Sequence, residues 1–295
     1  MVAISTTSWR SKAVGNLEIL TIMRRLNLIL VSVAMALCVC GCATESVEPL
    51  VEGTVLKIET ESRTSLGELN DGVRHVYWST GDVVAANGCS SAALSAQYDG
   101  SRGASFSFDQ QLTPPFEVVY PASIYKDENT ITLGRVHSGL AEDFDAPMCA
   151  YADGMEFSMK HLCGVVRVSI LGKDNLYELL YVAVISGENE AMYGDFTIDH
   201  EAGTLTPVED GRATYNNRRA VAKVVPSTER AVDVFVTIPA RTYNSGFTVR
   251  VVNKYGHYQD FVTTKSQTVE RGKVLAMPEV VFEPTNTIFD IDISM

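Results

Sequence analysis

Short runs in which apolar and polar residues alternate occur along most of the sequence, and turn-forming Gly, Asn, Asp or Pro residues bound them. Alternation with a period of two is typical of a β-strand that has one buried and one exposed face. We expect strands at residues 54–59, 74–78, 104–108, 116–120, 165–171, 181–185, 231–238, 247–253, 258–263 and 279–282. Because almost no amphipathic helical pattern of useful length accompanies them, the chain is expected to be all-β and built from β-sandwiches.

The strand pattern continues beyond residue 172 as a second series, which favours a division of the chain into two domains of ordinary size at about that residue. Bulky apolar residues on one side of the alternation predict the two cores. The N-terminal core is expected to contain Trp78, Phe106, Phe108, Val166, Val168 and Ile170, and the C-terminal core Phe235, Phe247 and Val249.

The first part of the sequence has the pattern of an export signal. Arg24 and Arg25 precede an apolar run at residues 26–39, which is too short, and too closely followed by acidic and polar residues, to suit a membrane span. The run leads into Val39-Cys40-Gly41-Cys42, which resembles the lipobox of bacterial lipoproteins. We therefore expect residues 1–41 to be a signal peptide, with Met23 as an alternative start, and Cys42 to carry acyl chains such as palmitate that anchor the protein in the outer membrane.

Composition and motifs argue against several classes of function. The net charge of −12 leaves no basic stripe for binding nucleic acid. The sequence contains no nucleophile elbow, zinc-protease motif, P-loop or dinucleotide fingerprint, so we expect no enzymatic activity, no cofactor and no metal. Cys89, Cys149 and Cys163 are an odd set in an exported chain, so at most one disulfide can form among them.

Three further patterns each have two interpretations. His161 and Cys163 are two residues apart and could bind a metal, although a structural histidine is the favoured interpretation. Asp290 and Asp292 share one side of a strand pattern, as a calcium site or an acid–base pair would need, but a solvent-facing side explains them as well. The aromatic cluster at residues 255–258 could stack on a sugar ring or could serve only the turn there.

A set of short motifs follows a characteristic order along the chain. They read WSTGDVV from Trp78, YPA from Tyr120, MKHLCGVVRV from Met159, MYGDFTID from Met192, IPA from Ile238 and ERGKV from Glu270. In this order, and behind a lipobox, they resemble the fimbrillin-like proteins of Bacteroidales, the pilus proteins of FimA and Mfa type. The resemblance implies two transthyretin-like β-sandwich domains in tandem, at 42–172 and 173–295. It also implies a cell-surface subunit of a type V-like pilus, or an accessory, anchor or tip protein of one.

The resemblance further implies that the protein assembles with other pilus subunits by β-strand exchange. In such pili a protease cuts after an arginine that follows the first strand, and a C-terminal strand of a neighbouring subunit fills the groove that is left. Residues 55–62 fit the early strand, and Arg63 is the candidate processing site. Residues 285–295 are the candidate donor strand, with Phe289, Ile291 and Ile293 on the apolar side. Alternatively, the first strand stays in place and the tail closes its own domain.

Two other functions remain open at this point. The chain could be a surface lipoprotein that never polymerises and binds a glycan or a host protein. It could also be a hydrolase on a sandwich scaffold, which the missing motifs disfavour. The sequence does not separate a stalk subunit from a tip or anchor protein.

Overall fold

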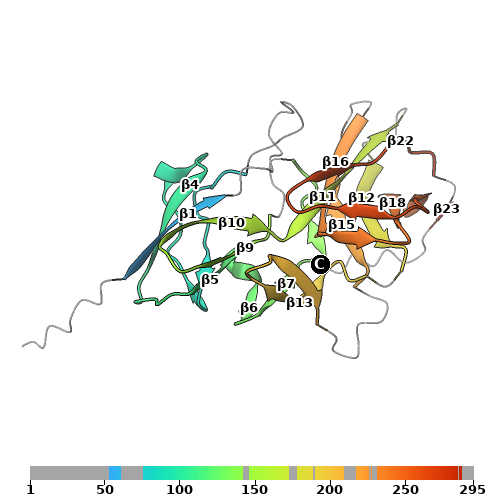
Figure 1. Ribbon diagram of the computed structural model, residues 1–295. Helices are drawn as coiled ribbons and strands as arrows, with labels where there is room; N and C mark the ends of the chain where they lie inside the picture. The colour runs from blue at the N-terminus through green and yellow to red at the C-terminus, as the bar shows by residue number, and fades with distance from the viewer. Residues whose placement is uncertain are drawn as a thin grey trace, which may run out of the picture. The chain divides into compact units, whose positions relative to one another are not determined.

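The computed structural model describes residues 53–60, 76–141, 146–172, 178–188, 190–208, 217–225, 227, 231–284 and 286–287. Within these ranges the regular structure consists of β-strands and two short 3₁₀ turns, η1 (Ala96–Tyr98) and η2 (Ala122–Ile124) (Figure 1). The predicted all-β class is confirmed. None of the helical segments in the described ranges is long and apolar enough to span a membrane.

The strands are numbered along the chain. They are β1 (Thr54–Thr60), β2 (Ala85–Ala86), β3 (Cys89–Ser90), β4 (Gly103–Phe108), β5 (Phe116–Tyr120), β6 (Tyr125–Asp127), β7 (Thr130–Leu133), β8 (Val136–His137), β9 (Met148–Ala152), β10 (Glu156–His161), β11 (Cys163–Leu171), β12 (Leu179–Ser186), β13 (Gly194–Asp199), β14 (Thr204–Pro207), β15 (Arg219–Lys223), β16 (Ala231–Pro239), β17 (Arg241–Tyr243), β18 (Phe247–Asn253), β19 (His257–Val262), β20 (Gln267–Val269), β21 (Val274–Ala276), β22 (Val280–Val281) and β23 (Asn286–Thr287).

A seven-stranded sheet has the order β3-β2-β5-β9-β10-β1-β4. Strand β1 lies inside it, parallel to β10 and antiparallel to β4. The inner face of this sheet contributes to a core cluster that contains Trp78, Phe106 and Phe108, so the prediction for these three residues is confirmed. The expected strand at residues 74–78 is not confirmed where the structure describes it, because Trp78 forms an isolated bridge with Ser101 instead.

A second core cluster joins two other sheets. Their orders are β16-β11-β21, with β22 also paired to β11, and β23-β19-β18-β12-β15-β8. Phe247 and Val249 belong to this cluster, as predicted. Phe235 is buried, but it packs with Val165 on the other side of β11.

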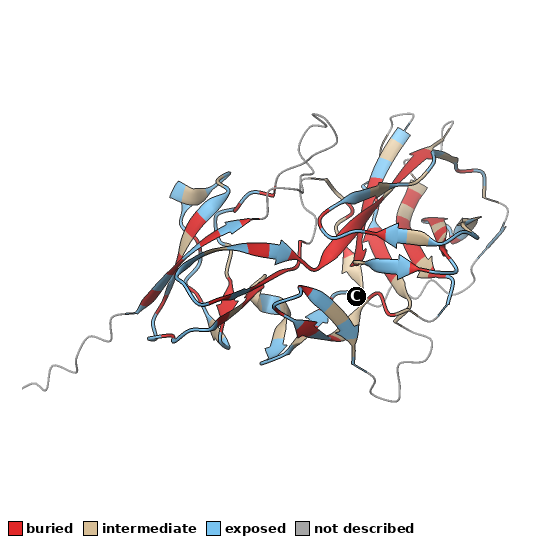
Figure 2. Cartoon of the chain, viewed as in Figure 1, coloured by how far each residue is buried: buried red, intermediate tan, exposed pale blue. Residues whose placement is uncertain are grey.

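The prediction that Val166, Val168 and Ile170 belong to the N-terminal core is wrong. All three pack in the cluster of Phe247 and Val249, because β11 pairs with β16, β21 and β22 from the last third of the chain. Figure 2 shows β11 buried along most of its length. The division at residue 172 stays a prediction, and if the chain forms two domains, this pairing groups β11 with the second.

A small sheet of order β14-β13-β7-β6 covers part of the outer face of the seven-stranded sheet. Phe196 and Ile131 of the small sheet share a buried cluster with Val119 of β5 and Cys149 of β9. Over β1 the outer face is exposed instead: Val55, Lys57 and Glu59 all face solvent. The seven-stranded sheet is therefore buried on both faces at β5 and β9 and on one face at β1.

Candidate functional site

The candidate site is strand β1 together with the two strands that hold it. The alternation of Thr54–Thr60 buries every second residue and exposes the others, as the sequence predicted. Lys57 N–H donates to the Met155 carbonyl at 2.8 Å on the β10 side, and Thr60 N–H donates to the Arg102 carbonyl at 2.9 Å on the β4 side. Both edges of β1 are thus paired, by segments that follow it in the chain by more than forty residues.

The inner face of β1 fills an apolar slot. Leu56 and Ile58 are fully buried, and the indole N–H of Trp78 donates to the Ile58 carbonyl at 3.2 Å. The Trp78 ring meets Phe106 edge-on at 4.9 Å and Tyr120 at 5.1 Å between centroids. The inner face of β1 packs on this aromatic cluster.

Buried hydroxyl groups mark both ends of the strand. Thr54 Oγ1 accepts a hydrogen bond from Leu112 N–H at 2.7 Å, and Thr60 Oγ1 donates to the Val76 carbonyl at 2.8 Å. Both threonines are almost fully buried. An apolar residue at either place would leave a buried backbone group of another segment without this partner, which costs about 1–3 kcal/mol.

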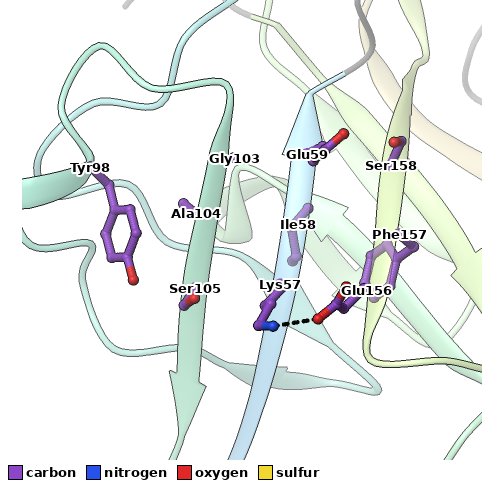
Figure 3. A pocket seen from close by; sticks show the side chains of 10 residues that line it. All are labelled: Lys57, Ile58, Glu59, Tyr98, Gly103, Ala104, Ser105, Glu156, Phe157 and Ser158. Atoms are coloured by element: carbon purple, nitrogen blue, oxygen red, sulfur yellow. Dashed lines mark hydrogen bonds and ion pairs between the residues drawn. The ribbon is translucent and has the colours of Figure 1, made fainter.

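The outer face of β1 lies in a shallow hollow of about 480 Å³ between β4 and β10 (Figure 3). Lys57 forms an ion pair with Glu156 of β10, and this hydrogen bond and the carboxylate charge raise the pKa of Lys57. The hollow forms because the neighbouring side chains are small: Gly103 and Ser105 of β4 on one side and Ser158 of β10 on the other.

This arrangement can accept a strand. If β1 were removed, the facing edges of β4 and β10 would each expose backbone donors and acceptors above an apolar slot. An exposed strand edge is a template for another strand, whose backbone satisfies those groups while alternate side chains enter the slot.

The predicted site residues themselves lie outside the described residues. This holds for Cys42, Arg63, Phe289, Ile291 and Ile293, and also for Asp290 and Asp292. In the candidate donor segment, Asn286 and Thr287 are described, and they pair with Tyr258 and His257 of β19. The start of the tail therefore lies on its own sheet, as in the alternative interpretation.

The histidine and the cysteines that the sequence offered for a metal site or a disulfide lie within the described residues. His161 is buried at the end of β10, and no group of three or more His, Cys, Asp or Glu residues in the described ranges is placed to hold a metal ion. Cys89, Cys149 and Cys163 are free thiols. Burial raises the pKa of Cys149 to about 12, so this thiol is unreactive at neutral pH.

The aromatic cluster at residues 255–258 forms the turn between β18 and β19. Tyr255 is exposed, and the Lys254 ammonium lies 5.0 Å from the centre of its ring. Gly256 has a φ of +80°, which the turn requires. Turn chemistry and a cation–π contact account for this cluster.

Sequence reasoning identified β1 but missed most of the residues that hold it. Glu156 and Trp78 meet the strand only through the fold, and nothing near them in the sequence indicates a partner in residues 54–60. Thr54 and Thr60 carried a usable signal, since both fall in phase with Leu56 and Ile58 and so predict buried hydroxyls.

Comparison with known proteins supports the fold. Searches found no matching protein family and no matching curated protein. Among solved structures, a candidate cell adhesion protein from Bacteroides ovatus is similar with a TM-score of 0.51 and 10% identity, over 78% of this chain and 93% of that one. The tip fimbrial protein Mfa3 and the fimbrial anchor protein Mfa2 from Porphyromonas gingivalis also match. For Mfa3 the TM-score is 0.37 and the identity 11%, over 79% of this chain and 97% of Mfa3. For Mfa2 the TM-score is 0.32 and the identity 11%, over 71% of this chain and 83% of Mfa2. At these identities the match with the Bacteroides ovatus protein shows a shared fold.

Proposed function

We propose that the protein is an accessory, anchor or tip component of a surface fimbria and contributes to adhesion. The observation that carries the proposal is β1, an internal strand with one apolar face whose two edges are paired by later segments. Its loss would leave a groove of defined register for a partner's strand. The fold shared with a candidate cell adhesion protein supports the same conclusion.

The proposal includes the features that the sequence resemblance implies. Two transthyretin-like sandwich domains follow a lipoprotein signal at residues 1–41. Cys42 is acylated and anchors the chain in the outer membrane. A lipoprotein with two or three acyl chains is held firmly, whereas a single chain binds a membrane only marginally. A protease cuts after Arg63, which lies three residues beyond the end of β1.

The test is the state of the protein on cells that express the full chain with its natural partners. Unboiled samples should contain high-mass species that boiling dissociates. Arg63→Ala should leave a folded monomer, because β1 then stays in its groove. Deletion of residues 285–295 should likewise prevent the chain from donating a strand.

Arg241→Ala is the matched control, since Arg241 is exposed on β17, distant in sequence from the processing site. It should leave the high-mass species unchanged. Wild-type protein found solely as a monomer would favour the non-polymerising surface lipoprotein. An unacylated mature N-terminus at another residue, found by mass spectrometry, would refute the lipid anchor.

A further inference from the structure

The tail of the chain repeats the pattern of β1 almost position by position. Residues 54–60 read TVLKIET and residues 287–293 read TIFDIDI. In this alignment a threonine comes first in both, and bulky apolar residues take the places of Leu56 and Ile58. A second copy's tail could therefore enter the β1 groove with its apolar side inward.

The alignment fails at the centre of the strand. Asp290 takes the place of Lys57, whose side chain is the ion-pair partner of Glu156 in the parallel register between β1 and β10. A carboxylate at that place would face the Glu156 carboxylate directly across the ladder. Like charges directly opposite in a sheet destabilise the pairing.

With the strand in the same direction, every other register either keeps this conflict or creates a different mismatch. A shift by two residues that places Phe289 at position 54 brings Asp292 to the place of Lys57. A shift of two residues the other way places Thr287 in the fully buried pocket of Leu56. A shift by one residue turns the aspartates inward, because side chains alternate between the two faces.

Two features at the ends of the groove add to the mismatch. Ile293 would take the place of Thr60 and remove the hydroxyl that donates to the buried Val76 carbonyl. Asn286 would take the place of Gly53, where any Cβ atom would lie 2.0 Å from the Phe108 carbonyl oxygen. The groove thus fits a glycine before its first hydroxyl residue and a second hydroxyl residue at its far end.

We propose that Glu156 determines which strand the groove accepts, and that it selects a strand of a different subunit with Lys or Arg at the place of Lys57 over a second copy's tail. The best occupant reads Gly-hydroxyl-x-apolar-Lys/Arg-apolar-x-hydroxyl. This inference rests on the proposed strand exchange and specifies its partner. It makes the chain a component of a mixed assembly.

The test uses the full chain with a specific protease site in place of residues 61–66, so that β1 can be cut from the chain and still occupy its groove. Pairs of isotopically labelled peptides compete at equal concentration for the groove, and native mass spectrometry measures the incorporated ratio. The wild-type tail peptide 285–295 competes with the same peptide carrying Asp290→Lys. A peptide of residues 52–62 is the positive control.

The Asp290→Lys peptide should be preferred about threefold to tenfold at low salt, because a repulsive cross-strand pair becomes an attractive one. The preference should shrink at 1 M salt, where charges are screened within about 3 Å. The tail peptide with Asp292→Lys is the matched control. In the first register Asp292 takes the place of Glu59, whose neighbours Gly103 and Ser158 carry no charge, so this peptide should change the incorporated ratio less.

The decisive arm is the Glu156→Lys protein, in which the preference should invert in favour of the wild-type tail. Glu156 is exposed, so this variant should fold normally. A ratio that stays the same in wild-type and Glu156→Lys protein would overturn the inference while strand exchange stands. If even the peptide of residues 52–62 is not incorporated, the groove does not exchange strands, and the proposed function fails with the inference.

Discussion

Strands β1 and β11 have the same kind of place in their sheets and differ in what covers them. Each is internal, with an antiparallel neighbour on one edge and a parallel neighbour on the other: β4 and β10 for β1, and β16 and β21 for β11. Strand β1 buries one face. Strand β11 buries both, with Val166 in the main core and Val165 against Phe235 on the opposite side.

The difference explains why β1, and not β11, is the strand proposed to exchange. A substitute for a strand with one buried face has to fit a single packed surface, whereas a substitute for β11 has to fit two. Strand β11 also has a close approach inside the strand itself, since a Cβ atom at Gly164 would lie 2.3 Å from the Glu270 carbonyl oxygen. Its neighbours therefore enclose it, while β1 meets water along its outer face.

The largest expected effect comes from removing the Trp78 side chain that packs against β1. Trp78→Ala should lower the free energy of unfolding by about 3–5 kcal/mol, because it deletes a buried aromatic side chain and its hydrogen bond to Ile58. Chemical denaturation measures the loss, with Tyr77→Ala as the control, since Tyr77 is 47% exposed. Hydrogen exchange should rise in β1 more than in β11; equal increases in both would contradict the separation of the two cores.

An alanine scan along both strands should reproduce their different burial. In β1, Ile58→Ala should cost about 2–5 kcal/mol and Glu59→Ala less than about 0.5 kcal/mol. In β11, Val165→Ala and Val166→Ala should each cost more than about 1 kcal/mol, because both lose buried methyl groups. An alternating profile in β11 would disprove its two-sided burial.

The hydroxyl at the end of β1 should have a smaller effect. Thr60→Val keeps the shape of the side chain and removes the donor to the Val76 carbonyl, so it should cost about 1–3 kcal/mol. Thr80→Val is the control at an exposed position. Equal melting temperatures for wild type and Thr60→Val would mean that this hydrogen bond does not stabilise the groove.

The smallest effect should be a pH dependence in the region that the small sheet covers. Burial lowers the pKa of His200, while the Glu117 carboxylate acts in the opposite direction. The unfolded chain then binds a proton at His200 more readily than the folded chain does. The contribution of His200 to stability should therefore fall as the pH drops below about 6.5, the pKa of an unperturbed histidine, and should be constant above it. His200→Gln should flatten the slope between pH 7 and pH 5 in thermal melts; an unchanged slope would assign it to other groups.

The sequence was informative where one face of a strand is apolar and the other polar. Alternation located β1, predicted which of its residues are buried, and placed Trp78 and Phe106 in one core. It failed at β11, because a strand buried on both faces has no alternation that identifies its partners, and the paired residues lie 60 to 110 residues further along the chain. Glu156 could not be predicted for the same reason, since its pairing with Lys57 arises from the fold alone.

The central claim is that β1 leaves the protein when it assembles and β11 does not, and quantitative mass spectrometry can test it directly. Trypsin releases residues 58–63 from the end of β1 and residues 168–173 from β11. Their ratio should be measured in the high-mass and monomeric fractions from the same cells. We predict that the β1 peptide is depleted relative to the β11 peptide in the high-mass fraction and not in the precursor; equal ratios in both fractions would contradict the exchange of β1.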